Sequence, residues 1–333
     1  MEKNIDKIIK NIIKECLDDN LADLLSQKII NKTYKLIEEK LDSEINKIIL
    51  PNLDSKLDVS NNIYDTLVLS GGGAKGIALI GALEYLNELK ILQNIKTIAG
   101  TSIGGLIGTL INIGYTPDEL YQFILLFDLD KIKSINVNNI FSTMGIDDGH
   151  RLEFILGKMF DAKNIDKNIT FKELYEKTKV KIILTGSCLN TKKIEYFSYE
   201  TYPDLKVIKG LRITTSIPIY FSPIQLENKM FVDGACIDNY PINIFNNNLE
   251  KVIGIYLKST KDSLDTINSI EDYLKSIIDT FDEGISIKSI NNYEKYTILI
   301  DVDKVGMIDT NFDKKFKETL YNAGYNNAKL FFL

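Results

Sequence analysis

Short, uninterrupted apolar runs alternate with stretches of helical periodicity from Tyr64 onward, and this alternation limits the folds open to the chain. Such runs are typical of strands that are buried on both faces of a sheet. Helices between them join strands that run in the same direction. We therefore expect an α/β fold with a mainly parallel central sheet and helices on both faces. Expected strands are 65–70, 96–100, 180–187, 193–199, 229–233, 251–257 and 296–301, and expected helices are 76–88, 106–114, 150–160, 171–177, 269–288 and 311–331.

Two other parts of the chain differ from this alternation. In residues 1–62, apolar side chains recur at helical spacing, and a turn-rich stretch after Pro51 ends the pattern. We expect an N-terminal helical segment over 1–62, followed by a single α/β domain over 63–333. The segment either packs on that domain or mediates homodimer formation, regulatory-partner binding or membrane contact. The Asn-rich stretch 131–148 is expected to be a loop.

Composition excludes several classes of protein. The net charge of −6 offers no basic excess for phosphates, so we expect no nucleic-acid partner. Three widely spaced cysteines fit neither a disulfide framework nor a zinc site and favour a reducing compartment.

The charged N-terminus lacks the apolar core of a signal peptide. The uncharged stretch 97–117 is long enough to span a bilayer, but its glycines favour a strand, a turn and a buried helix. We expect a cytoplasmic protein without a transmembrane helix.

A glycine cluster follows the first expected strand. Gly71, Gly73 and Gly76 satisfy the G-x-G-x-x-G pattern of dinucleotide-binding loops. That pattern requires an acidic residue about 20 positions later to hold a ribose hydroxyl, and none is present at the end of the second strand. A phosphate loop of the Walker type requires Ser or Thr after Lys75, where the chain has Gly76. A nucleotide-binding protein remains the less favoured alternative.

The second expected strand ends in Gly100-Thr101-Ser102-Ile103-Gly104, a G-x-S-x-G pattern. Such a sequence typically places a serine on a sharp strand-to-helix turn, with small neighbours that relieve crowding. The following helix N-terminus favours developing negative charge. Ser102 is therefore the candidate nucleophile.

A serine nucleophile needs a base, and the chain has a single histidine. A hydrolase triad runs Ser, acid, His along the chain, but His150 follows Ser102 by only 48 residues, at an expected helix start. No later histidine can take its place, so His150 is expected to be a surface or capping residue. One histidine also removes most histidine-based metal sites. The base must then be Lys, Asp or Glu, and Asp233 in FVDGA ends a short strand. An Asp-Gly pair is equally typical of a turn.

Together these residues resemble the patatin-like lipid acyl hydrolases, a group of phospholipases. The resemblance has three blocks in the family's order, which are GGGAKG (71–76), GTSIG (100–104) and DGA (233–235). Connecting segments extend it from Tyr64 to about Tyr256. Two positions depart from the pattern, because Lys75 stands where Arg is frequent and Ala235 where Gly is frequent.

The resemblance implies a Ser-Asp dyad without a metal or cofactor. Ser102 would attack an ester carbonyl, and a buried Asp233 with a raised pKa would act as its base. Backbone N–H groups of Gly72, Gly73 and Lys75 would form the oxyanion hole. The Lys75 side chain would either attract a lipid phosphate or be solvated. The supporting glycines are Gly71, Gly76, Gly100, Gly104 and Gly234.

The expected function is a lipid acyl hydrolase of the phospholipase A type, acting on phospholipids or other lipid esters during transient contact with a membrane surface. The alternative from another class is a catalytically silent lipid-binding or scaffold protein on the same fold.

Overall fold

The computed structural model describes residues 64–127, 129–135, 139–258, 292–302 and 312–333, with a few isolated residues between 267 and 290. These residues lie within one compact unit, Asn62–Leu333. The expected helical segment 1–62 lies outside the described residues, as does most of the expected helix 269–288.

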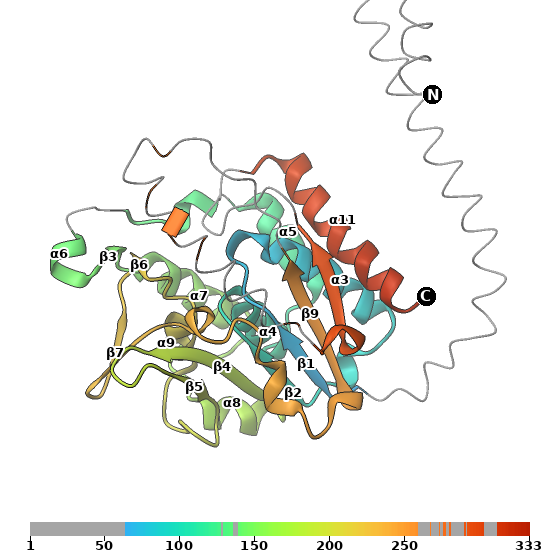
Figure 1. The fold of residues 1–333 in the computed structure, drawn as a ribbon, viewed down its shortest axis with the longest axis horizontal. Coiled ribbons are helices and arrows are strands. Elements are labelled where there is room, and N and C mark those ends of the chain that lie inside the picture. Colours follow the sequence, from blue (N-terminus) through green and yellow to red (C-terminus); the bar gives the residue numbers. More distant parts are fainter. Residues whose placement is uncertain are drawn as a thin grey trace, which may run out of the picture. The chain divides into compact units, whose positions relative to one another are not determined.

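A mainly parallel sheet forms the centre of this unit, which confirms the expected α/β class (Figure 1). The strand order is β10-β9-β1-β2-β4-β8-β7, and the first five of these strands run parallel to one another. Strands β8, β7 and β5 add antiparallel pairs on the β4 side. The bounds are β1 Thr66–Leu69, β2 Thr97–Gly100, β4 Lys181–Cys188, β5 Lys193–Phe197, β7 Ile224–Leu226, β8 Lys229–Asp233, β9 Val252–Lys258 and β10 Thr297–Asp301.

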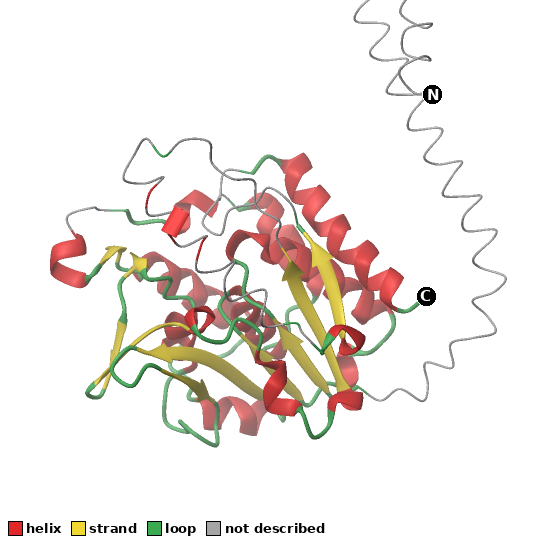
Figure 2. Cartoon of the chain, in the orientation of Figure 1, coloured by secondary structure: helices red, strands yellow, loops and turns green. Residues whose placement is uncertain are grey.

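Most of the described α-helices pack around the sheet, whereas α6 lies apart from it beside β3 (Figure 2). Their bounds are α3 Gly76–Glu88, α4 Ile103–Asn112, α5 Pro117–Leu126, α6 Asn139–Thr143, α7 His150–Ala162, α8 Phe171–Thr178, α9 Val207–Thr214 and α11 Lys314–Phe331. Successive side chains of a strand point to opposite faces of the sheet. The last three residues of β1 are all apolar because both faces are buried there. Leu67 and Leu69 join the large core with the helices, whereas Val68 joins a smaller core with Tyr240 and Ile242.

Three elements near the cavity described below differ from the expectation. Helix α5 begins at a capping box in which the Thr116 hydroxyl accepts from the Glu119 N–H, with Pro117 in the first turn. The stretch expected to be a loop contains α6 and a short strand, β3 Gly145–Asp147. Strand β3 pairs in parallel with β6, Ile219–Phe221. A three-residue strand is too short for periodicity to reveal.

Candidate active site

Ser102 lies on a strained turn between β2 and α4. Its φ of 52° and ψ of −125° lie outside the regions that residues with a side chain ordinarily occupy. A Cβ at Gly104 would overlap the carbonyl oxygen of Ser70 at the end of β1. The small residue therefore lets the turn approach the neighbouring strand closely, which is the role that the G-x-S-x-G pattern predicts.

Buried hydroxyl groups from distant segments support this turn. The Ser102 N–H donates to the Thr214 Oγ1 at 3.0 Å. Below it, the Thr185 Oγ1 lies 3.5 Å from the Thr214 Oγ1 and donates to the Thr101 Oγ1 at 2.8 Å. Thr101 in turn donates to the carbonyl oxygen of Asp238 at 3.0 Å. Such a connected polar network fixes a backbone conformation that would be unfavourable alone.

The pairing of three strands brings Asp233 to the same edge of the sheet as Ser102. Gly100 of β2 is level with Leu184 of β4, and Gly186 of β4 is level with Asp233 of β8. Thr185 of β4 donates to the hydroxyl of Thr101, next to Ser102, and also lies against Gly234, next to Asp233. Ser102 and Asp233 therefore lie on either side of β4, and both are buried.

Backbone contacts hold Asp233 in place. Its N–H donates to the Ser216 carbonyl oxygen at 2.8 Å, and its Oδ1 accepts from the Ala235 N–H at 2.9 Å. A Cβ at Gly234 would overlap the Thr185 hydroxyl, so this glycine lets the Asp233 turn lie against the hydroxyl network.

The glycine loop joins β1 to α3 beside the elbow. Gly73 has a φ of 55° and begins the 3₁₀ helix η2, Gly73–Lys75. The Lys75 N–H donates to the Gly72 carbonyl oxygen at 3.1 Å, so this expected oxyanion-hole donor is already occupied. The Lys75 side chain is 1% exposed, which corrects the expectation that it is solvated or available to a lipid phosphate. Gly76 opens α3 and packs against Ile103 of α4.

The side chain of Asn239 lies near Ser102, and the sequence patterns do not single it out. The backbone carbonyl oxygen of Asn239 accepts from the Gly71 N–H at 3.0 Å. A Cβ at Gly71 would overlap the Asn239 Oδ1 and lie 3.4 Å from the Ser102 Cβ. Asn239 is buried, and its Oδ1 has no hydrogen-bond partner among the described residues. An unsatisfied buried oxygen beside the candidate nucleophile is unfavourable for folding and therefore points to a role in the site.

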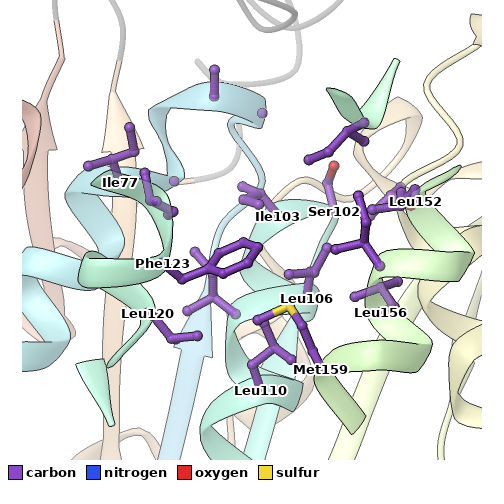
Figure 3. Close-up of a pocket in the computed structure, with 18 of the residues that line it drawn as sticks. Ile77, Ser102, Ile103, Leu106, Leu110, Leu120, Phe123, Leu152, Leu156 and Met159 are labelled. Carbon is purple, nitrogen blue, oxygen red and sulfur yellow. The ribbon is translucent and has the colours of Figure 1, made fainter. Parts of the chain in front are cut away.

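An apolar cavity of about 220 Å³ opens at Ser102. Figure 3 shows the Ser102 hydroxyl at one end and Leu110, Leu120 and Met159 toward the other. Helix α4 forms one wall through Ile103, Leu106, Ile107 and Leu110. Helices α3, α5 and α7, the residues 132–133 and strand β6 form the rest. The cavity can hold an extended apolar chain with its polar end at the serine.

Among the described residues near the site, Ser102 remains the one candidate nucleophile. Burial and the charge of Asp233 raise the pKa of Cys236 to about 12, so its thiol stays protonated near neutral pH. His150, the single histidine, begins α7 and is exposed. Within the described ranges, no cluster of three His, Cys, Asp or Glu side chains is arranged to hold a metal ion. In the same part of the chain, no helix combines the length and the apolar character that crossing a bilayer requires.

Comparisons with known proteins agree with this arrangement. A family model described as patatin-like phospholipase matches residues 67–246. A probable lipid hydrolase, 463L of Invertebrate iridescent virus 6, is 38% identical over 187 residues, which are 54% of this chain and 63% of that protein. The uncharacterized protein R571 of Acanthamoeba polyphaga mimivirus is 30% identical over 81% of this chain and 94% of its own length.

A more distant relative and a solved structure extend the comparison. Lysophospholipase NTE1 of Candida albicans is 24% identical over 69% of this chain, which spans only 16% of that protein. The crystal structure of VipD from Legionella pneumophila has the same fold, with a TM-score of 0.53 and 15% identity over 81% of this chain and 67% of its own.

Proposed function

Because the chain belongs to the patatin-like phospholipase family, we propose that it is a lipid hydrolase that cleaves fatty-acyl esters of phospholipids through Ser102 and Asp233. The observation that carries the proposal is the position of Ser102, on a strained turn at the head of an apolar cavity. A polar nucleophile at the end of an apolar cavity suits a substrate with a carbonyl group at one end of a long hydrocarbon chain.

In the proposed reaction, the Ser102 Oγ attacks the ester carbonyl carbon while Asp233 accepts the hydroxyl proton. The carbonyl oxygen becomes an oxyanion, which the backbone N–H groups of Gly72 and Gly73 stabilise. The alcohol part leaves with the proton from Asp233, and the acyl group stays on Ser102. Water then attacks the acyl-enzyme, again with Asp233 as base, and the fatty acid is released.

The remaining elements support these steps. The bond to Ser216 holds the backbone of Asp233, and the Ala235 N–H holds its carboxylate in one orientation. The apolar cavity excludes water from the acyl chain and lowers the local dielectric constant, which strengthens the oxyanion interaction. The sn-position follows from which acyl chain enters the cavity, because that chain is the one whose carbonyl reaches Ser102.

The experiment that tests the proposal measures fatty-acid release from phospholipid vesicles. Ser102→Ala and Asp233→Asn should each lower the rate by a factor of about 10³ or more while leaving the fold intact. Asp204→Asn is the matched control, because Asp204 is exposed and distant in the chain from every site residue. Full activity of Ser102→Ala would refute the proposal.

A fluorophosphonate probe separates an enzyme from a silent lipid-binding protein on the same fold. An activated serine attacks phosphorus, so the probe should label the peptide that contains Ser102, with the other serines of the chain as internal controls. Lipid binding without labelling would favour the silent protein.

A further inference from the structure

Large apolar side chains are exposed beside the cavity in unusual number. Among the described residues, thirteen large apolar side chains are exposed, and five of them fall between positions 126 and 154. These five are Leu126, Ile135, Phe141, Met144 and Phe154, and Phe141 is 93% exposed. Single exposed apolar residues are ordinary, but a group of them on one part of a protein marks an interaction surface.

Two of these side chains, Leu126 and Phe154, belong to helices that also form the cavity wall. Helix α5 places Phe123 and Ile124 in the wall and leaves Leu126 exposed at its end. Helix α7 places Leu152 and Ile155 in the wall and Phe154 outside.

Two further wall segments lie next to exposed apolar residues in the chain or through strand pairing. Residues 132–133 line the cavity, and Ile135 follows them outside. Strand β6 lines the cavity with Tyr220 and Phe221. It pairs with β3, and the exposed Met144 immediately precedes β3 in the chain. Figure 1 shows α6, β3 and β6 together at the end of the described unit away from α11.

The charges of the same segment favour a lipid surface as the occupant. The Lys158 ammonium on α7 lies 5.6 Å from the centre of the exposed Phe154 ring. Lysines whose stems lie along apolar groups are typical of residues at a membrane interface, where the ammonium meets phosphate.

The exposed acids nearby are engaged within the protein. Asp148 accepts the His150 N–H at 2.9 Å, and Glu153 forms an ion pair with the buried Arg212 at 3.4 Å. Their charges are therefore partly offset before any phosphate approaches.

From these observations we infer that Leu126, Ile135, Phe141, Met144 and Phe154 form a membrane-docking surface that inserts into the outer layer of a phospholipid bilayer. The inference rests on the proposed function, because the acyl chain of a membrane lipid has to reach the cavity. With the cavity wall pressed against the bilayer, an acyl chain passes from one apolar environment to another with little exposure to water.

The test uses vesicle binding by the Ser102→Ala chain, so that hydrolysis does not alter the vesicles. Sedimentation with phosphatidylcholine vesicles should show a partition coefficient about tenfold or more lower for Phe141→Ser combined with Met144→Ser. Leu330→Ser is the matched control, because Leu330 is also exposed but lies on α11. Its partition coefficient should stay within about twofold of the parent value.

A spectroscopic measurement locates the contact directly. The sequence contains no tryptophan, so Phe141→Trp and Leu330→Trp each introduce a single emitter. Vesicles should shift the emission of the tryptophan at 141 to shorter wavelength and leave that at 330 unchanged. Equal shifts, or equal binding by the double variant and its parent, would overturn the inference.

Two further outcomes are distinguishable. If the double variant changes the oligomeric state in the absence of vesicles, the surface joins copies of the chain and the inference is wrong. If the parent chain binds vesicles through this surface but the active enzyme releases no fatty acid, only the proposed function is wrong.

Discussion

The backbone N–H of Ser102 donates to the side-chain hydroxyl of Thr214 at 3.0 Å, although 112 residues separate the two in the chain. Thr214 is the last residue of α9, so this helix end directly fixes the conformation of the strained turn. The bond also satisfies a buried donor that the start of α4 would otherwise leave unpaired.

Replacing Thr214 with valine should therefore impair both folding and turnover. Valine keeps the shape but removes the acceptor, so the Ser102 N–H is left buried and unpaired, which typically lowers the free energy of unfolding by about 1–3 kcal/mol. We expect kcat on a dispersed short-chain ester to fall about tenfold or more with a smaller change in KM. Thr214→Ser keeps the hydroxyl and should retain most of the activity. Unchanged kcat in the valine variant would show that the turn does not need this bond.

Removing the Asn239 side chain should affect stability and activity in opposite directions. Its Oδ1 is buried without a partner among the described residues, so Asn239→Ala removes an unfavourable burial. We expect a melting temperature equal to or above that of the wild type and a clearly lower kcat for ester hydrolysis. Thermal unfolding and steady-state kinetics on the same preparations measure both. A variant that loses stability while keeping its kcat would assign Asn239 a purely structural role.

The far end of the cavity should set the preferred acyl length. Leu110 lies deep in the cavity (Figure 3), so Leu110→Phe shortens the space available to a chain attached at Ser102. The ratio of kcat/KM for long-chain to short-chain esters should fall about tenfold or more, since pocket contacts of a few methylenes have this magnitude. Ile111→Phe adds the same volume at the adjacent position, which does not line the cavity, and serves as control. An equal fall of this ratio in Leu110→Phe and in Ile111→Phe would mean that helix α4 itself was disturbed.

Two glycine-to-alanine changes should have opposite effects on stability. The Cβ of Gly104→Ala would overlap the Ser70 carbonyl oxygen, a backbone atom that has no free space to move into. We expect this variant to lose about 1–3 kcal/mol of unfolding free energy. At Gly157 of α7 the nearest atom to a new Cβ is a flexible lysine carbon at 3.6 Å. Alanine is the better helix former, so Gly157→Ala should gain up to about 1 kcal/mol. Chemical denaturation of both variants measures the contrast.

The pH dependence of stability should reveal the buried Asp238. Burial raises the pKa of its carboxyl group above the ordinary value, despite the hydrogen bond from Tyr196 at 2.8 Å. A raised pKa in the folded state means that this group contributes stability below the ordinary pKa and loses that contribution as the pH rises through the raised one. Asp238→Asn resembles the protonated form. The melting temperature of the variant minus that of the wild type should therefore increase as the pH rises over this interval. A constant difference at every pH would contradict the shift.

The sequence predicts the elements whose signals are local. The expected helix 76–88 and the expected strand 229–233 match α3 and β8 at both ends. Ser102 follows β2 and Asp233 ends β8, each at a turn that needs glycine, so short patterns reveal these candidate site residues. Their positions on either side of β4 depend on strand pairing, which no local pattern encodes.

The elements that sequence reasoning missed have weak or non-local signals. Helix α9 lacks a side-chain cap at Lys206, so nothing marks its start. The capping box at Thr116 and Glu119 could have revealed α5. The role of Thr214 depends on contact with Ser102 across the fold, and the burial of Lys75 depends on packing around η2. A single sequence contains neither contact.

The hydroxyl network beneath Ser102 also bears on the order in which the chain is made. Thr185, Thr214, Asp233 and Asp238 all leave the ribosome after Ser102, and without them the strained turn has no support. A nascent or prematurely ended chain that stops before Asp233 thus carries the serine but neither its proposed base nor the bonds that orient it. If Ser102 and Asp233 act as proposed, the chain has no competent active site until synthesis has passed these residues.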